Sequence, residues 1–286
     1  MLLRRKFIGI SAIISLLLCS ILFLDCQFFK SPPLLEWDNN PEDLNLTILM
    51  DSPNDSNMIE LRTKYKLEEI VAGSKNDYER LRKVVKWTHD QWKQSGSNWP
   101  SHSDPLTILK EASEGERFRC VEYAIVVAAC ARTLGMPSRV LALKRKDVET
   151  ARSDAGHVVA EVWLNQFNKW VFVDAQFDAI PEVDGVPLNA VEFQDAIARN
   201  TPGLVIRSFS TGYKKWYHKK WISPYLYYFD FKIDQRFFLE KSEKKQGRIM
   251  LVPKGAKNPK VFQGKYPIEN CTYISAPEAF YPLIKE

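Results

Sequence analysis

Cysteine and histidine are scarce in this chain of 286 residues, which contains five Cys and four His. Outside the apolar N-terminal run and its border, only Cys120, Cys130 and Cys271 remain. Such an odd and sparse set does not form a disulfide framework. Cys120 and Cys130 are ten positions apart on one predicted helix, a rise of about 15 Å, which is too long for a disulfide. No Cys/His cluster has the spacing of zinc ligands, so we expect no metal and no other cofactor.

Internal repeats, low-complexity tracts and nucleic-acid-binding signatures are also missing, which argues against solenoids and against a nucleic-acid partner. The apolar fraction of 45% and the charged fraction of 26% are ordinary for a globular protein. The net charge of +5 is unevenly spread, because residues 211–286 hold 13 Lys and 2 Arg against 7 acidic residues. This basic third could face a membrane or a cell-wall polymer, although a solvated lysine-rich surface is the simpler interpretation.

The N-terminus has the pattern of an export signal or a membrane anchor. Arg4, Arg5 and Lys6 precede residues 7–24, an uncharged apolar run of 18 residues that ends at Asp25. A helix of that length covers about 27 Å, close to the thickness of the hydrocarbon core of a bilayer.

No small-residue cleavage site follows cleanly, so we expect residues 1–25 to be a retained anchor, with the rest of the chain extracytoplasmic, periplasmic or at the cell surface. A twin-arginine export signal, lipidation at Cys19 or Cys26, and a buried helix of a soluble domain remain alternatives. Residues 26–57 are typical of a linker.

Apolar periodicity predicts helices first and a mainly antiparallel sheet afterwards, which is an α+β arrangement. We expect Ser74 to cap the first of these helices. The predicted helices cover residues 74–93, 106–112, 120–134 and 189–198, and the predicted strands cover residues 139–143, 157–164 and 170–174. We expect a catalytic domain over residues 58–205. Residues 206–286, rich in aromatic and basic side chains, would extend the sheet or form a small β subdomain.

Cys120 opens a helix that is apolar nearly all round and therefore belongs in a core. The unpaired amides and positive dipole end of a helix stabilise a thiolate and lower the pKa of a thiol. The same amides can stabilise the oxyanion that forms when a sulfur attacks a carbonyl. Glu122 lies two positions further on, roughly on the opposite side of the helix, so it need not oppose a thiolate.

A thiol nucleophile needs a base and a group that orients the base. His157 begins one predicted strand and Asp174 ends the next. A turn centred near Gln166 and Phe167 would place Asp174 opposite Val159, one diagonal step from His157 and on the same face. The spacing therefore predicts a Cys120–His157–Asp174 triad.

Three segments resemble the transglutaminase-like superfamily. Residues 118–124 (FRCVEYA) and 131–140 (ARTLGMPSRV) resemble its nucleophile helix and the following strand, residues 156–163 (GHVVAEVW) its histidine strand, and residues 169–174 (KWVFVD) its aspartate strand. The resemblance implies a papain-like α+β core in which Cys120 is the nucleophile, His157 the general base and acid, and Asp174 the orienting carboxylate. Phe118 departs from the small residue that many members carry there.

The resemblance implies a thiol enzyme that hydrolyses or transfers amide bonds through a thioester, with a protein, peptide or cell-wall amide as substrate. The alternative is an inactive binding or scaffold protein at the cell envelope that uses the aromatic stretch 214–229 as its working surface. Trp99 or another upstream tryptophan could donate an indole N–H to an oxyanion, whereas core packing is the expected role of Trp87 and Trp92.

Overall fold

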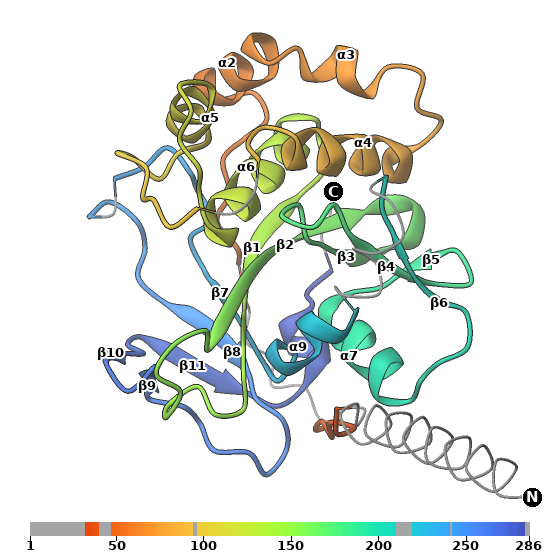
Figure 1. Cartoon of the computed structure of the whole chain (residues 1–286), viewed down its shortest axis with the longest axis vertical. Coiled ribbons are helices and arrows are strands. Elements are labelled where there is room, and N and C mark those ends of the chain that lie inside the picture. The colour runs from red at the N-terminus through yellow and green to blue at the C-terminus, as the bar shows by residue number, and fades with distance from the viewer. Residues whose placement is uncertain (1–31, 40–46, 94–95, 210–218, 241, 284–286) are drawn as a thin grey trace, which may run out of the picture. The chain divides into compact units, whose positions relative to one another are not determined.

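The computed structural model describes residues 32–39, 47–93, 96–209, 219–240 and 242–283 (Figure 1). Residues from Leu34 onward form one compact unit. The predicted anchor, residues 1–25, lies outside the described residues and stays a prediction. Within the described part of the chain, no helix is both long and apolar enough to span a bilayer.

In the described part of the chain, five helices precede the first strand of the main sheet and lie together on one side of it (Figure 1). They are α2 (Ser56–Lys64), α3 (Leu67–Val71), α4 (Asp77–His89), α5 (Pro105–Ser113) and α6 (Cys120–Thr133). Helix α6 is central, since every residue from Glu122 to Thr133 is buried and α2, α4 and α5 all contact it. The apolar composition of residues 120–134 therefore predicted its place correctly.

Side-chain caps set where α4 and α5 begin. Asp104 accepts a hydrogen bond from the Thr107 amide at 2.9 Å, and Pro105 occupies the first turn. The predicted cap of α4 at Ser74 is wrong, because Asn76 accepts from the Glu79 amide at 2.9 Å and the helix begins at Asp77. Both residues are good caps with an acidic residue three positions on, so the sequence pattern alone could not separate them.

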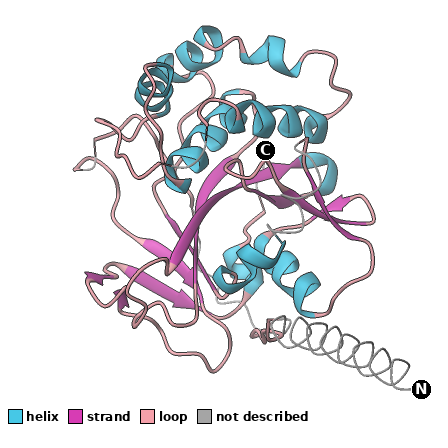
Figure 2. Cartoon of the chain, viewed as in Figure 1, coloured by secondary structure: helices cyan, strands magenta, loops and turns pink. Residues whose placement is uncertain are grey.

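The main sheet has six strands in the order β11-β8-β7-β1-β2-β3 (Figure 2). All neighbours pair antiparallel except β11 and β8, which run parallel. The strands are β1 (Ser138–Lys144), β2 (Gly156–Leu164), β3 (Lys169–Val173), β7 (Tyr228–Lys232), β8 (Arg248–Leu251) and β11 (Cys271–Ile274). The α+β prediction is confirmed, and strands from the last third of the chain belong to the same sheet as the predicted histidine and aspartate strands.

Shorter elements surround this sheet. Strands β4 (Ile180–Val183), β5 (Val186–Pro187) and β6 (Leu204–Arg207) form a three-stranded sheet, and β9 (Val261–Phe262) pairs with β10 (Tyr266–Pro267). Other described helices are η1 (Asn165–Phe167), α7 (Ala190–Ala198), η2 (Ser223–Tyr225) and α9 (Pro277–Phe280), and residues 219–222 are also helical.

Strand alternation divides the core into two layers. Ala160 and Val162 of β2 pack in the cluster that contains α6, whereas Val159 packs in the cluster that contains Phe193 of α7 and Phe280 of α9. The sheet is therefore covered by helices on both faces.

An enclosed ion pair fastens β1 to β2 and to the C-terminal helix. Arg139 donates to Glu161 at 2.7 Å and to the Phe280 carbonyl at 3.0 Å, and both charged side chains are fully buried. Glu161 also accepts from the Ala190 amide and from the Tyr281 hydroxyl. Because all of these groups find partners, the buried charges are compensated.

Candidate active site

The chain just before α6 is held by a close backbone contact. The Gly96 amide donates to the Phe118 carbonyl at 2.9 Å, and Asn98 forms a parallel bridge to Phe118. A Cβ atom on Gly96 would lie 2.0 Å from the Arg117 carbonyl oxygen, so only glycine fits there. Phe118 is completely buried and meets Trp92 edge to face at 5.6 Å. The core therefore accommodates the large side chain of Phe118 at a position where many family members carry a small residue.

Cys120 is the first residue of α6 and is partly exposed. Glu122, one turn into the same helix, accepts from the Arg119 amide at 3.0 Å and pairs with the Arg119 guanidinium at 2.6 Å. This contact caps the helix and offsets the carboxylate charge of Glu122. The acidic residue in the first turn therefore leaves the helix start suitable for a thiolate.

The hairpin of β2 and β3 carries His157 and Asp174 in the predicted register. Ala160 pairs with Val173 at the end of the ladder, and the next step places Val159 opposite Asp174. The Nε2 atom of His157 lies 2.7 Å from Asp174 Oδ2, and both side chains are buried.

The loop that follows Asp174 is fixed from two sides. Asp174 and Ala179 exchange two backbone hydrogen bonds of 2.9 Å. His89 Nδ1, at the end of α4, lies 3.2 Å from the Ala175 carbonyl oxygen and 3.0 Å from that of Gln176. The carboxylate is thus anchored through its own backbone and through a neighbouring helix.

The electrostatics of His157 connect all three predicted residues. Burial lowers the pKa of His157, but the charge and hydrogen bond of Asp174, together with a hydrogen bond and charge interaction with Cys120, outweigh burial and raise the pKa to about 9. Because Nε2 faces Asp174, the hydrogen bond with Cys120 falls to Nδ1. The structure therefore brings Cys120, His157 and Asp174 together, while their catalytic role stays a prediction.

Among the described residues, three aromatic side chains enclose the imidazole of His157. The Trp221 ring meets it edge to face at 4.8 Å, and the rings of Tyr225 and Phe177 lie at 6.0 and 6.1 Å. Sequence reasoning placed Trp221 and Tyr225 in the aromatic stretch 214–229 but did not assign them to the site. Local pattern gave no signal for that contact, because they are more than 60 positions from His157.

The tryptophans that precede Cys120 in the chain have separate roles. Trp87 and Trp92 pack in or against the α6 core cluster, as predicted. The indole N–H of Trp92 is buried and has no hydrogen-bond partner among the described residues, and its ring lies 4.1 Å from that of Tyr123 in α6. Trp99 is largely exposed and stacks on the Arg119 guanidinium at 3.5 Å.

The other described thiols, Cys130 and Cys271, lie elsewhere. Cys130 is completely buried, and burial raises its thiol pKa; burial also raises the pKa of Cys271. Cys120, Cys130 and Cys271 are all free. Among the described residues, no three His, Cys, Asp or Glu side chains gather as metal ligands.

Comparison with known proteins gives a family match over the region that carries this site. The sequence model of the transglutaminase-like superfamily matches residues 64–175, which include Cys120, His157 and Asp174. No curated protein matches the chain.

Solved structures show weak similarity. A candidate cysteine protease from Cytophaga hutchinsonii is 15% identical with a TM-score of 0.33, over 58% of this chain and 61% of that one. A transglutaminase is 16% identical with a TM-score of 0.32, over 46% and 34% of the two chains. The red sea bream transglutaminase is 16% identical with a TM-score of 0.30, over 44% and 27%.

The chain thus spans less than two thirds of each of these structures. Similarity this low carries no functional argument, so the family assignment depends on the family match and on the segments around the three residues. The family match over residues 64–175 confirms the resemblance of this part of the chain to the transglutaminase-like superfamily.

Proposed function

We propose that the protein is a thiol enzyme that acts on amide bonds through a Cys120 thioester. The observation that carries this proposal is the buried contact of His157 with Asp174 at 2.7 Å, combined with the hydrogen bond of His157 to Cys120 at the start of α6. A nucleophile, a base and an orienting carboxylate are the three groups that covalent acyl transfer requires.

In the proposed reaction, the Cys120 thiolate attacks the amide carbon, and the carbonyl electron pair moves to oxygen. The amides at the start of α6 stabilise that oxyanion. Collapse of the intermediate breaks the C–N bond, and the leaving amine takes the proton of the His157 imidazolium. The product is a thioester at Cys120.

The second half-reaction restores the thiol. His157 removes a proton from water or from an acceptor amine, which attacks the thioester carbon and displaces the sulfur. Water gives hydrolysis and an amine gives acyl transfer. Asp174 keeps its negative charge throughout and stabilises the imidazolium.

We also propose a location for the protein, based on the prediction for its N-terminus. Residues 1–25 would export or anchor the chain, and the catalytic part would meet a protein, peptide or cell-wall amide outside the cytoplasm. The membrane would be a partner through this N-terminal segment alone.

The alternative of an inactive binding protein finds less support. It needs the aromatic stretch 214–229 as an exposed working surface, but Tyr225, Tyr228 and Phe229 are buried. Residues 214–218 of that stretch, with Trp216 and Tyr217, lie outside the described residues. An enclosed His–Asp pair beside a partly exposed thiol fits turnover better than passive binding.

Labelling with a peptide vinyl sulfone, which captures thiol nucleophiles that accept an amide substrate, tests the proposal. We expect rapid modification of wild-type Cys120, none in Cys120→Ala, and at least about tenfold slower reaction in His157→Ala. Cys271→Ala is the matched control and should react like wild type. Equal total labelling of wild type and Cys120→Ala, with mass spectrometry locating the label elsewhere, would refute the proposed nucleophile.

A further inference from the structure

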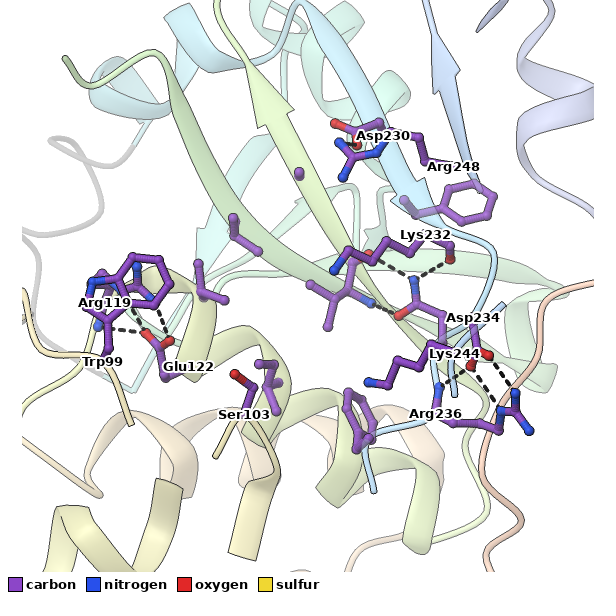
Figure 3. A pocket seen from close by; sticks show the side chains of 18 residues that line it. Trp99, Ser103, Arg119, Glu122, Asp230, Lys232, Asp234, Arg236, Lys244 and Arg248 are labelled. Atoms are coloured by element: carbon purple, nitrogen blue, oxygen red, sulfur yellow. Dashed lines mark hydrogen bonds and ion pairs between the residues drawn. The ribbon is translucent and has the colours of Figure 1, made fainter. Parts of the chain in front are cut away.

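Open space separates the start of α6 from part of the main sheet. A cavity of about 430 Å³ lies there, and its lining includes Val121 and Ile125 of α6 and Ala142 of β1. Figure 3 shows Glu122 of the helix on one side of this space and Asp230 of β7 on the other. Because protein interiors are otherwise close-packed, a space of this size leaves helix and sheet without direct contact at this point. The alignment of the thiol on the helix with the histidine and the carboxylate on the sheet therefore depends on contacts around the cavity.

One such contact joins α4 to the loop that follows Asp174. His89, the last residue of α4, places Nδ1 3.2 Å from the Ala175 carbonyl oxygen and 3.0 Å from the Gln176 carbonyl oxygen. Both carbonyl oxygens can only accept, so Nδ1 carries a proton and donates to both. This donor exists in the neutral Nδ1–H tautomer and in the imidazolium, so the contact does not depend on the charge of His89.

Helix α4 belongs to the layer that carries the nucleophile. Val85 and Thr88 of α4 are buried, and the helix packs against α6. His89 directly follows this buried stretch, so its backbone is held to the same layer as Cys120. The side chain of His89 therefore connects the layer that holds the thiol to the loop that begins at Asp174.

The two carbonyls that face His89 have few other partners. Ala175 is buried, and its carbonyl also accepts from the Asp178 amide at 3.3 Å. Gln176 is partly buried, and in the described part of the chain His89 is the one hydrogen-bond partner found for its carbonyl. A carbonyl that loses its partner inside a protein raises the energy of that conformation. Without His89, the loop would therefore shift to satisfy these carbonyls.

The same loop supplies two groups that contact the imidazole of His157. Asp174 begins the loop, with its carboxylate 2.7 Å from Nε2, and Phe177 lies within it, with its ring 6.1 Å from the imidazole. Two backbone hydrogen bonds of 2.9 Å between Asp174 and Ala179 close the base of the loop. His89 holds the part of the loop between these ends. A shift of the loop would thus change how both groups meet His157.

We propose that His89 is a positioning residue of the triad, whose Nδ1–H fixes the loop 174–179 to the helix layer and so aligns the carboxylate of Asp174 with His157 and Cys120. The inference rests on the proposed function for the catalytic meaning of this alignment. The alignment itself belongs to the resting protein and can be measured without turnover.

Two substitutions of His89 test the proposal. His89→Leu removes the donor at similar size, whereas His89→Asn replaces it, because the amide nitrogen of Asn occupies nearly the place of Nδ1. Burial lowers the pKa of His157, and the interactions with Asp174 and Cys120 raise it to about 9. A weakened contact with Asp174 in His89→Leu should therefore lower this pKa, as read by NMR titration, and slow Cys120 labelling by a peptide vinyl sulfone by about threefold to tenfold. His89→Asn should restore both.

Arg80→Met is the matched control. Arg80 also lies in α4 and donates to a backbone carbonyl, that of Leu134, at 3.1 Å. This variant should keep the wild-type pKa of His157 and the wild-type labelling rate, whatever stability it loses. Wild-type values in His89→Leu, a loss that His89→Asn does not restore, or an equal loss in Arg80→Met would each overturn the proposal.

A measurement on the wild type keeps the proposal testable if His89→Leu does not fold. Nitrogen-15 NMR, assigned with His89→Asn, should show a protonated Nδ1 in His89 from about pH 5 to about pH 9, and an unprotonated Nδ1 would overturn the assigned contact. Failure of the proposed function has a different sign. Wild type and Cys120→Ala would then label equally with the peptide vinyl sulfone, while the values measured on the resting protein would stay as expected.

Discussion

Replacing Asp174 by Asn removes one negative charge from a site that is almost closed to water, with little change in shape. In the wild type, this charge lies 2.7 Å from His157 Nε2 and is a main cause that raises the pKa of His157 from 6.5 to about 9. Each pKa unit corresponds to about 1.4 kcal/mol, so the Asp174 and Cys120 interactions stabilise the folded imidazolium by roughly 3 kcal/mol, net of burial. In Asp174→Asn, burial is left as the dominant influence, and the pKa of His157 should fall below its usual range.

The sign of the pH dependence follows from the direction of this shift. Because the folded protein holds the His157 proton more tightly than the unfolded chain, the stabilisation is fully present below about pH 6.5 and is lost as the pH rises through about 9. The difference in unfolding free energy between wild type and Asp174→Asn should therefore be roughly 3 kcal/mol or more near pH 6, and shrink toward pH 10. Groups that titrate alike in both proteins cancel in this difference.

Urea denaturation of the full chain at a series of pH values measures the difference. Asp147→Asn is the matched control, since Asp147 pairs with Arg145 at the surface and should contribute under about 1 kcal/mol with little pH dependence. NMR titration of the imidazole, assigned with His157→Gln, should give a value near 9 in wild type. A stability difference that stays constant, or grows, with rising pH would refute the assigned charge interaction.

Two further changes test the framework around the site. Gly96→Ala should lower the thermal midpoint by several degrees and slow Cys120 labelling, because its Cβ would lie 2.0 Å from the Arg117 carbonyl oxygen. Calorimetry measures the thermal midpoint, and mass spectrometry measures the labelling. An effect no larger than that of Ser97→Ala, at an exposed position, would contradict the expected clash. Arg139→Met should cost about 3–5 kcal/mol in urea unfolding, because it leaves the buried Glu161 without its cation. The exposed control Arg199→Met should cost under about 1 kcal/mol, and a comparably small loss for Arg139→Met would show that Glu161 is compensated by other groups.

Local sequence patterns predicted the parts of the site that local structure builds. The apolar run that ends at Gly135 and Pro137 gave helix α6, and so placed Cys120 at its first turn. Alternation in β2 and β3, with a polar turn between them, gave the register that puts Asp174 opposite Val159. These predictions succeeded because periodicity and turn length decide them within about 20 residues.

Contacts between distant segments were not predictable in the same way. The sequence around Trp221 is irregular, and the pairing of β7 with β1 brings its neighbourhood to His157. The cavity near the start of α6 likewise combines residues 99–125, 140–158 and 230–248, which meet only after the sheet has formed. A single sequence carries no pairing information over such separations. Its charge pattern indicated a basic last third of the chain, but not which surfaces those basic residues would form.

The enclosure of His157 has a consequence for how the site must work. Trp221 and its neighbours exclude water from the imidazole, which strengthens the attraction to Asp174 and at the same time raises the energetic cost of an unpaired charge there. The imidazolium is therefore stable only while Asp174 stays ionised beside it. After His157 has given its proton to the leaving amine, the imidazole must regain a proton from the group that attacks the thioester, because solvent does not reach the ring. Because the partly exposed side of the triad is the sulfur and not the ring, substrates should reach the site across the start of α6, where Arg119 and Val121 flank Cys120.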